Sequence, residues 1–161
     1  MSNKAPYEAS SVMNTAVISV GPHATLEEVV KILADNRISG LPVVDSDNKV
    51  IGVITETDIV NFATKVHVIP LIGTSGWLSP YIDVTEIAKF KKGFNLLANT
   101  KVEKVMSKRP VTASAGTYIN KVAELMKKRD INRVFVIDKE GKIIGVIARA
   151  DLVDYLAEWK R

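Results

Sequence analysis

The stretch Gly52-Val53-Ile54-Thr55-Glu56-Thr57-Asp58 decides the fold. An apolar run of β-forming residues leads into Thr55, Asp58 follows three residues later, and a helical pattern of apolar residues begins at Ile59. We therefore predict a strand that ends near Thr55 and a helix that begins near Glu56. The free N–H groups and the positive dipole end of a helix N-terminus attract an anion, so this junction is a candidate binding site.

The same pattern returns as Gly145-Val146-Ile147-Ala148-Arg149-Ala150-Asp151. A shift of 93 residues aligns 12–60 with 105–153 without a gap, and thirteen positions are identical. The identical pairs include Met13/Met106, Val29/Val122, Ile38/Ile131, Val43/Val136, Asp45/Asp138, Gly52/Gly145 and Asp58/Asp151. An internal match of this length indicates a duplicated structural unit.

The residue pattern of each copy predicts the element order β-α-β-β-α, so we expect an α/β (α+β) fold. In the first copy we expect an extended stretch over 17–20, a strand over 41–44, a turn over 45–48 and a strand over 50–55. Thr25 and Glu28 form a capping box at the start of the first helix. The predicted apolar helix faces are Leu26, Val29, Val30 and Leu33 in one copy and Ile119, Val122, Ala123 and Met126 in the other. We expect Val43/Val136 and Val53/Val146 to be buried at equivalent places.

Three segments follow from this alignment: residues 1–63 are a first repeat with an N-terminal tail, 64–104 are an insert, and 105–161 are a second repeat. Within the insert, Asp83 begins a capping motif for a helix over 84–97. The apolar face of that helix is Ile87, Phe90, Phe94 and Leu97. We hypothesise that 70–83 changes order when a ligand binds and that the helix presents a face to a partner. The alternative is that the insert only covers apolar surface.

Composition narrows the functional classes. The chain has no cysteine, which excludes thiolate nucleophiles and cysteine-based metal sites, and its two histidines lack ligand-like spacing. We expect no metal, no membrane span, no secretory signal and a cytoplasmic location. Residues 101–161 carry a net charge of +6 against −2 for residues 1–100. This basic half leaves nucleic-acid binding as an alternative, although no recognition motif accompanies it.

Two sequence motifs, one in each copy, make the repeat resemble a CBS domain. These are Ile38-Ser39-Gly40-Leu41-Pro42-Val43-Val44-Asp45 with Gly52-Val53-Ile54-Thr55-x-x-Asp58, and Ile131-Asn132-Arg133-Val134-Phe135-Val136-Ile137-Asp138 with Gly145-Val146-Ile147-x-x-x-Asp151. Two such domains in tandem resemble a CBS pair, or Bateman module, of the stand-alone type. The insert also gives a looser likeness to stand-alone CBS-pair proteins of plant organelles. The resemblance covers about two thirds of the chain and implies that the repeats pack about a pseudo-two-fold axis.

The resemblance implies a regulatory, energy-sensing module without catalytic activity. It would bind AMP, ADP or ATP as a regulatory ligand in clefts between the repeats and signal to a partner that the sequence does not identify. The first implied site consists of Asp58, Thr55, Thr57, Thr15, Ala16, Val17, Ser39, Gly40, Leu41 and Pro42. The second consists of Asp151, Arg149, Ala148, Pro110, Val111, Asn132, Arg133, Val134 and Phe135. S-adenosyl compounds are an alternative ligand class.

The chemistry of these residues agrees with that implication. A carboxylate accepts hydrogen bonds from both hydroxyls of a ribose diol, and an arginine fork suits phosphate oxygens. The two sites differ, because Ala148 replaces the hydroxyl residue of the motif and Phe135 stands where Pro42 stands in the first repeat. Arg133, Arg149 and Arg109 could supply charge there instead. The resemblance also implies a homodimer, formed through the runs Ile59/Val60/Phe62 and Leu152/Tyr155/Leu156.

Overall fold

The computed structural model describes residues 7–66, 68 and 84–159, which form two compact units. Unit 1 comprises residues 1–19, 44–51 and 108–161, and unit 2 comprises residues 20–43 and 52–107. The hypothesis about 70–83 and the predicted cap at Asp83 lie outside the described residues. The expected pseudo-two-fold packing of the repeats stays a prediction.

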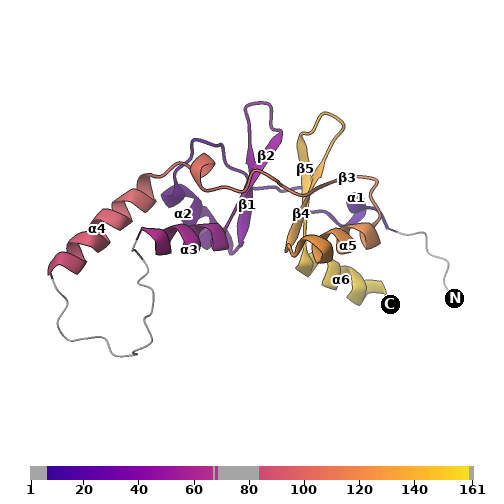
Figure 1. The fold of residues 1–161 in the computed structure, drawn as a ribbon. Helices are drawn as coiled ribbons and strands as arrows, with labels where there is room; N and C mark the ends of the chain where they lie inside the picture. The colour runs from indigo at the N-terminus through magenta and orange to yellow at the C-terminus, as the bar shows by residue number, and fades with distance from the viewer. Residues whose placement is uncertain (1–6, 67, 69–83, 160–161) are drawn as a thin grey trace. The chain divides into compact units, whose positions relative to one another are not determined.

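The first repeat forms the elements that the sequence predicts. Helix α2 (Leu26–Asn36) precedes the hairpin of β1 (Gly40–Val44) and β2 (Val50–Thr55), and α3 (Glu56–Lys65) follows directly (Figure 1). The expected extended stretch over 17–20 pairs with β1 only through a single parallel bridge from Val20 to Val43. Thr25 caps α2 as predicted: its hydroxyl accepts from the Glu28 N–H, and its own N–H and hydroxyl donate to the Glu28 carboxylate. These bonds lower the pKa of Glu28.

The second repeat has the same order of elements. Strand β3 (Thr112–Ser114) pairs in parallel with β4 (Arg133–Ile137), which pairs antiparallel with β5 (Ile143–Ala148). Helix α5 (Ile119–Arg129) lies between β3 and β4, and α6 (Arg149–Trp159) follows β5 (Figure 1). Tyr118 at the start of α5 stands where Thr25 stands in α2, and its side chain makes no cap bond. The fold is therefore mixed α+β, as predicted.

The two hydrophobic cores correspond position by position. The core cluster of unit 1 contains Ala9, Ala113, Ile119, Val122, Met126, Val134, Val136 and Ile147. The residues 93 positions away, Val102, Val20, Leu26, Val29, Leu33, Leu41, Val43 and Ile54, are all buried in unit 2. The prediction for Val43 and Val136 is thus confirmed.

The expected burial of Val53 and Val146 is wrong in degree, because both are half-buried while Ile54 and Ile147 are fully buried. Neighbouring strand residues point to opposite faces, so only one of each adjacent pair can face the core. The predicted helix faces are also too wide: Val30 is 41% exposed, and Ala123 is exposed as well.

Each unit is completed by a segment that precedes the other repeat in the sequence. In unit 1, α1 (Ala9–Val12) packs against α5, and Asn14 exchanges two backbone hydrogen bonds with Val146, of 2.9 and 3.0 Å. In unit 2, the short 3-10 helix η1 (Val102–Lys104) takes the corresponding place, and Ser107 exchanges two bonds of 2.9 Å with Val53. The segments before the two repeats are therefore exchanged between them.

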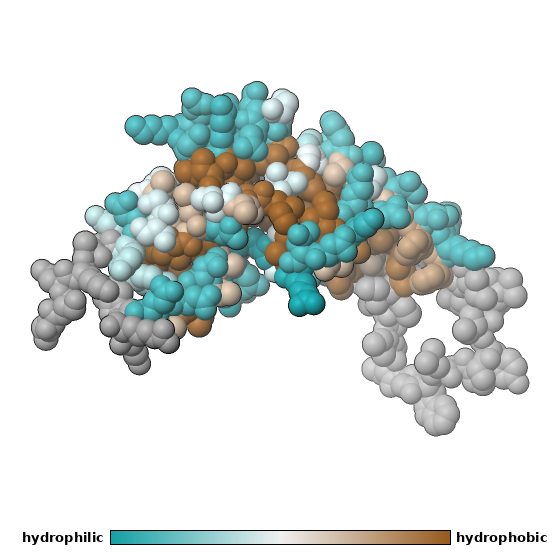
Figure 2. Space-filling view, turned by 180° about the vertical axis from the view of Figure 1, so that it is seen from behind, coloured by the Kyte–Doolittle hydropathy of each residue, from teal (hydrophilic) through white to brown (hydrophobic). Residues whose placement is uncertain are grey.

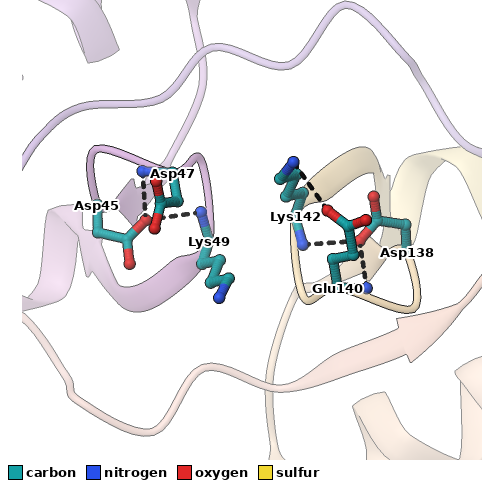
Figure 3. Close-up of polar contacts among 6 residues, drawn as sticks. All are labelled: Asp45, Asp47, Lys49, Asp138, Glu140 and Lys142. Atoms are coloured by element: carbon teal, nitrogen blue, oxygen red, sulfur yellow. Dashed lines mark hydrogen bonds and ion pairs between the residues drawn. The ribbon is translucent and has the colours of Figure 1, made fainter.

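Both hairpin turns belong to unit 1 and are built alike (Figure 3). One carboxylate oxygen of Asp45 accepts from the N–H groups of Asp47 and Lys49, and Asp138 accepts in the same way from Glu140 and Lys142, each at 2.9 Å. Lys49 and Lys142 form a bridge between the turns. In Figure 2 hydrophilic side chains mark these turns at the top of the view.

The insert supplies α4 (Val84–Asn99), which contacts α2 and α3. Leu97 and Ala98 near its C-terminal end are buried. Phe90 and Phe94, on the predicted apolar face, are 48% and 49% exposed and stack on each other with ring centroids 6.4 Å apart. The predicted apolar face of this helix is therefore only partly buried, because the N-terminal half of α4 extends beyond α2 and α3 (Figure 1).

The first prediction concerns Gly52. A Cβ atom there would lie 2.6 Å from the Met106 sulfur and 2.9 Å from the carbonyl oxygen of Ser107, the residue that pairs with Val53. Gly52→Ala should lower the free energy of unfolding by about 1–3 kcal/mol, measured by urea denaturation, because this backbone oxygen must shift. The control is Gly116→Ala, whose Cβ would meet nothing within 4 Å. Equal effects of the two substitutions would contradict the close-approach account.

The second prediction concerns the capping box of α2. Thr25→Ala removes the acceptor for the Glu28 N–H and should cost about 1 kcal/mol of unfolding free energy. Thr25→Ser keeps the hydroxyl and is the matched control, so it should change stability by much less. If serine and alanine destabilise alike, the methyl group rather than the cap supports the helix.

Candidate functional site

The first junction is a complete capping box at the start of α3. Asp58 Oδ2 accepts from the Thr55 N–H at 2.9 Å and from the Thr55 hydroxyl at 2.7 Å. The Asp58 N–H donates to the Thr55 hydroxyl oxygen at 3.3 Å, and the Glu56 N–H donates to the Ser39 carbonyl at 3.0 Å. Asp58 Oδ1 has no hydrogen-bond donor among the described residues. The cap therefore orients the carboxylate but uses only one of its oxygens.

The second junction keeps the carboxylate but loses the hydroxyl. Asp151 Oδ2 accepts from the Ala148 N–H at 2.6 Å, and the Arg149 N–H donates to the Asn132 carbonyl at 3.0 Å, as at the equivalent positions of the first junction. Within the described residues, the N–H groups of Ala150 and Asp151 meet no acceptor. The N-terminus of α6 thus offers two donors as well as the second carboxylate oxygen.

Capping and ligand binding are compatible in this geometry. The fixed Oδ2 orients each carboxylate, and Oδ1 remains as an acceptor for hydroxyl groups of a ligand. The unpaired N–H groups at the start of α6 are donors for an anionic oxygen, and the helix dipole favours that charge. One junction can therefore hold a diol and an anion that belong to the same molecule.

Charged side chains differ between the junctions. Arg133 lies opposite Ala148 in the β4–β5 ladder, and Arg149 makes only a long ion pair of 3.8 Å with the exposed Asp130. Asp58 lines a cavity of about 200 Å³ together with Lys65 and Lys104. Asp151 lines a cavity of about 210 Å³ together with Asp154 and Glu158. The cavity that Asp58 lines is thus the more basic, while the arginines lie at the second junction.

The structure brings together most of the predicted residues of the first site. Ser39 and Gly40 precede and begin β1, and a Cβ on Gly40 would lie 3.0 Å from the Ile54 carbonyl oxygen, so the two strands approach closely here. Thr57 is exposed in the first turn of α3. The predicted residues Thr15, Ala16 and Val17 belong to unit 1, where Thr15 and Ala16 are exposed and Val17 is half-buried, so they are not part of the unit that contains the rest of this site.

All predicted residues of the second site belong to unit 1 and come from neighbouring elements. The Phe135 N–H donates to the Val111 carbonyl at 3.2 Å, which sets the segment of Pro110 and Val111 beside β4. Arg133 in β4 faces the end of β5, from which Ala148, Arg149 and Asp151 continue into α6. The structure therefore gathers this predicted site at one end of the three-stranded sheet and at one helix N-terminus.

Several predicted residues have buried side chains. Leu41, Pro42, Val134 and Phe135 all lie in the interior, and Phe135 is only 2% exposed. Their side chains present no open surface, so these positions can meet a ligand only through their backbone. Sequence reasoning also missed Lys65 and Lys104. The signal for Lys65 was its place two helical turns after Asp58.

Two further features of the described residues concern metal ions and membranes. No group of three or more histidine, aspartate or glutamate side chains there is arranged to hold a metal ion. In the same part of the chain, no helix combines the length and the apolar content needed to cross a bilayer.

Comparisons with known proteins agree with this architecture. The CBS domain family matches residues 9–65 and again 102–158. The uncharacterized protein MJ1426 of Methanocaldococcus jannaschii is 35% identical over 135 residues, which cover 81% of this chain and 80% of that protein. The chloroplastic CBS domain-containing protein CBSX1 of Arabidopsis thaliana is 29% identical over 146 residues, which cover 88% of this chain and 60% of that protein.

Solved structures show the same fold. CBSX2 in complex with AMP matches with a TM-score of 0.72 at 20% identity, over 96% of this chain and 99% of that chain. The CBS domain pair of protein MJ0100 from a complex with 5'-methylthioadenosine and S-adenosyl-L-methionine matches with a TM-score of 0.67 at 21% identity, over 98% and 100% of the two chains. This chain therefore belongs to the CBS domain family and carries two CBS domains in tandem.

Proposed function

We propose that this chain is a non-catalytic regulatory module that binds an adenine nucleotide at its strand-to-helix junctions and passes the occupancy to a partner protein. The observation that carries the proposal is the pair of capped aspartates, Asp58 and Asp151, each with one uncommitted carboxylate oxygen. The ligands named for CBSX2 and MJ0100 are AMP, 5'-methylthioadenosine and S-adenosylmethionine, and all carry adenine on a ribose whose 2'- and 3'-hydroxyls are free. The ribose diol is the shared group that such a carboxylate would bind.

The phosphate would be held at the second junction. Two amide donors at the start of α6 lie beside Arg149 and Arg133, so that junction has positive charge and directional donors for an anion. The first junction has the Thr55 hydroxyl instead, but this hydroxyl already donates to Asp58. We therefore expect the second junction to be the tighter site for a phosphate-bearing ligand.

The third prediction tests the carboxylates by titration calorimetry with AMP, ADP, ATP and S-adenosylmethionine, with GMP as a comparison. Asp151→Ala should weaken binding of AMP by about 1.5–3 kcal/mol, the range for a hydrogen bond to a charged group, and Asp58→Ala should matter less. The control is Thr25→Ala, which removes a helix cap away from both junctions and should lower stability without changing the dissociation constant. If the Asp variants behave like this control, both aspartates are only helix caps.

The fourth prediction separates phosphate contact from nucleoside contact. Arg149→Ala should weaken AMP binding while leaving 5'-methylthioadenosine binding unchanged, because the latter has no phosphate. The matched control is Arg129→Ala, which removes an exposed arginine from the last turn of α5. Equal losses for both ligands would place Arg149 away from the phosphate.

Binding experiments of the same kind also test the alternative function, nucleic-acid binding. Binding of a polynucleotide would fall steeply with salt through counterion release, whereas binding of one nucleotide at a fixed site would fall much less. A steep salt dependence with polynucleotide, and no heat with any mononucleotide, would replace the present proposal.

A homodimer also belongs to this proposal, but the surface expected from the sequence needs correction. Ile59 is buried and Phe62 is half-buried in α3, which is in contact with α4. Val60 and Leu156 are 50% and 62% exposed, whereas Leu152 and Tyr155 are half-buried, so only part of the expected apolar runs is accessible. The contact of α4 with α2 and α3 is the physical reason for the difference.

A further inference from the structure

Two methionines occupy equivalent places against the strands of the two units. A Cβ atom on Gly52 would lie 2.6 Å from the Met106 sulfur, and one on Gly145 would likewise meet the Met13 sulfur. Both glycines are buried, whereas both methionines are half-buried. Each methionine side chain therefore covers a strand backbone while part of its surface stays open to water.

The backbone of each methionine is held by the short helix before it. The Met13 N–H donates to the Ala9 carbonyl at 2.9 Å, and the Met106 N–H donates to the Val102 carbonyl at 2.8 Å. The sulfur and the backbone of each residue are thus fixed at two separate points. The side chain has no room to leave its glycine without moving the segment that carries it.

The residue that follows each methionine pairs with the strand beneath it. Asn14 exchanges its two backbone hydrogen bonds with Val146, and Ser107 exchanges its two with Val53. Val146 and Val53 directly follow the covered glycines in β5 and β2. A displacement of either methionine is therefore passed to the neighbouring residue that makes the pairing.

The chemistry of a thioether makes this contact sensitive to oxidants. The chain has four methionines and no cysteine, so methionine carries all of its sulfur. A peroxide oxidises the thioether by two electrons: one oxygen atom moves to sulfur to form the sulfoxide, and the peroxide is reduced to water or an alcohol. A methionine sulfoxide reductase reverses this step with a dithiol, which becomes a disulfide as water is released.

The sulfoxide does not fit the contact that the thioether makes. A Cβ atom has no room between either sulfur and its glycine, so an oxygen atom on that side has none either. The N–H groups of Val53 and Val146 beside the glycines already donate to Ser107 and Asn14. Because a polar oxygen left without a hydrogen bond is costly, the oxidised side chain should turn toward water.

Met126 provides the contrast within the same chain. Its side chain belongs to the core cluster of unit 1 and is only 3% exposed. A peroxide in solution cannot reach that sulfur while the unit is folded. Accessibility therefore separates the two methionines that cover glycines from the one in the core.

We propose that Met13 and Met106 are sites of reversible sulfoxidation by peroxides, and that this modification releases the segment pairing in each unit. Reduction of the sulfoxide restores the pairing, so each site acts as a redox-sensitive device within the fold. The modification is independent of nucleotide binding and can be tested without a ligand.

The fifth prediction follows oxygen incorporation into the full chain treated with hydrogen peroxide under native conditions. Peptide mass spectrometry should find one added oxygen atom on Met13 and one on Met106 before any on Met126. Equal oxidation of all three methionines overturns the proposal, because oxidation would then follow unfolding. The proposal also fails if Met13 and Met106 stay unmodified.

Hydrogen exchange of the same samples measures the pairing. Oxidation should raise the exchange rates at least about tenfold at the four paired amides, which are those of Asn14, Val53, Ser107 and Val146. The Phe135 N–H, which donates to the Val111 carbonyl before β3, is the internal control and should keep its protection. Unchanged exchange at the four amides after both sulfurs are oxidised, or an equal rise at Phe135, contradicts local release.

Leucine variants test whether the two sulfurs cause the effect. Leucine keeps the apolar volume of methionine but cannot take up oxygen. Peroxide should lower the Tm of the wild-type chain by about 5 °C or more and should leave Met13→Leu with Met106→Leu unaffected. Met126→Leu is the matched control and should lose as much as the wild type.

Enzymatic reduction completes the test. Methionine sulfoxide reductase with dithiothreitol should return the oxidised wild-type chain to its original Tm and exchange rates. Loss of Tm in the peroxide-treated double leucine variant, or no recovery once both sulfoxides are reduced, overturns the proposal. If the leucine variant does not fold, mass spectrometry and exchange of the wild-type chain still decide the outcome.

Discussion

The structure depends on the exchange of two backbone segments between the repeats. Asn14 pairs with Val146 in unit 1, and Ser107 pairs with Val53 in unit 2, so neither unit is complete without a segment that precedes the other repeat. Both pairings require close approach, and both place a methionine over a glycine. A Cβ on Gly52 would lie 2.6 Å from the Met106 sulfur, and one on Gly145 would likewise meet the Met13 sulfur. The identical pairs Met13/Met106 and Gly52/Gly145 thus have one physical cause.

The duplication gives both repeats the same order of elements. The two strand-to-helix junctions differ in their side chains, and these differences can give the repeats different functions. The carboxylate at each junction is kept, together with the backbone bond from the first helical residue to the segment before the middle strand. The hydroxyl is kept only at Thr55, and its loss at Ala148 leaves amide donors uncovered at α6. Helix α4 contacts α2 and α3 of the first repeat, and among the described residues the second repeat has no such helix.

Local features were predictable from the sequence, and tertiary ones were not. The capping box of Thr25, the two aspartate turns and the junction at Thr55 depend on residues within four positions of each other, so spacing alone predicted them. The burial of Ile54 rather than Val53 was not predictable, because an unbroken apolar strand does not show which face meets the core. The exposure of Phe90 and Phe94 depends on how far α4 extends past its neighbours, which no periodicity encodes.

The residues of the candidate site were predictable from the sequence, but their contacts were not. The motif positions predicted Asp58, Asp151 and Arg149 as site residues. The structure places all three in the first turns of α3 and α6, as expected. The one-oxygen cap at each aspartate, the unpaired amides of Ala150 and Asp151, and the cavity that Lys65 and Lys104 share with Asp58 are products of three-dimensional packing. These details are what would allow a junction to bind a ligand as well as to cap a helix.

Amide chemical shifts during titration with AMP test the central claim most directly. If the junctions bind the nucleotide, the largest changes in a nitrogen-15 spectrum should fall on the N–H groups of Ala150 and Asp151, which acquire an acceptor, and should saturate with AMP. If AMP leaves these two amides unchanged while shifts elsewhere saturate, or if no residue shifts at all, the junctions are helix caps and the account of the site is wrong.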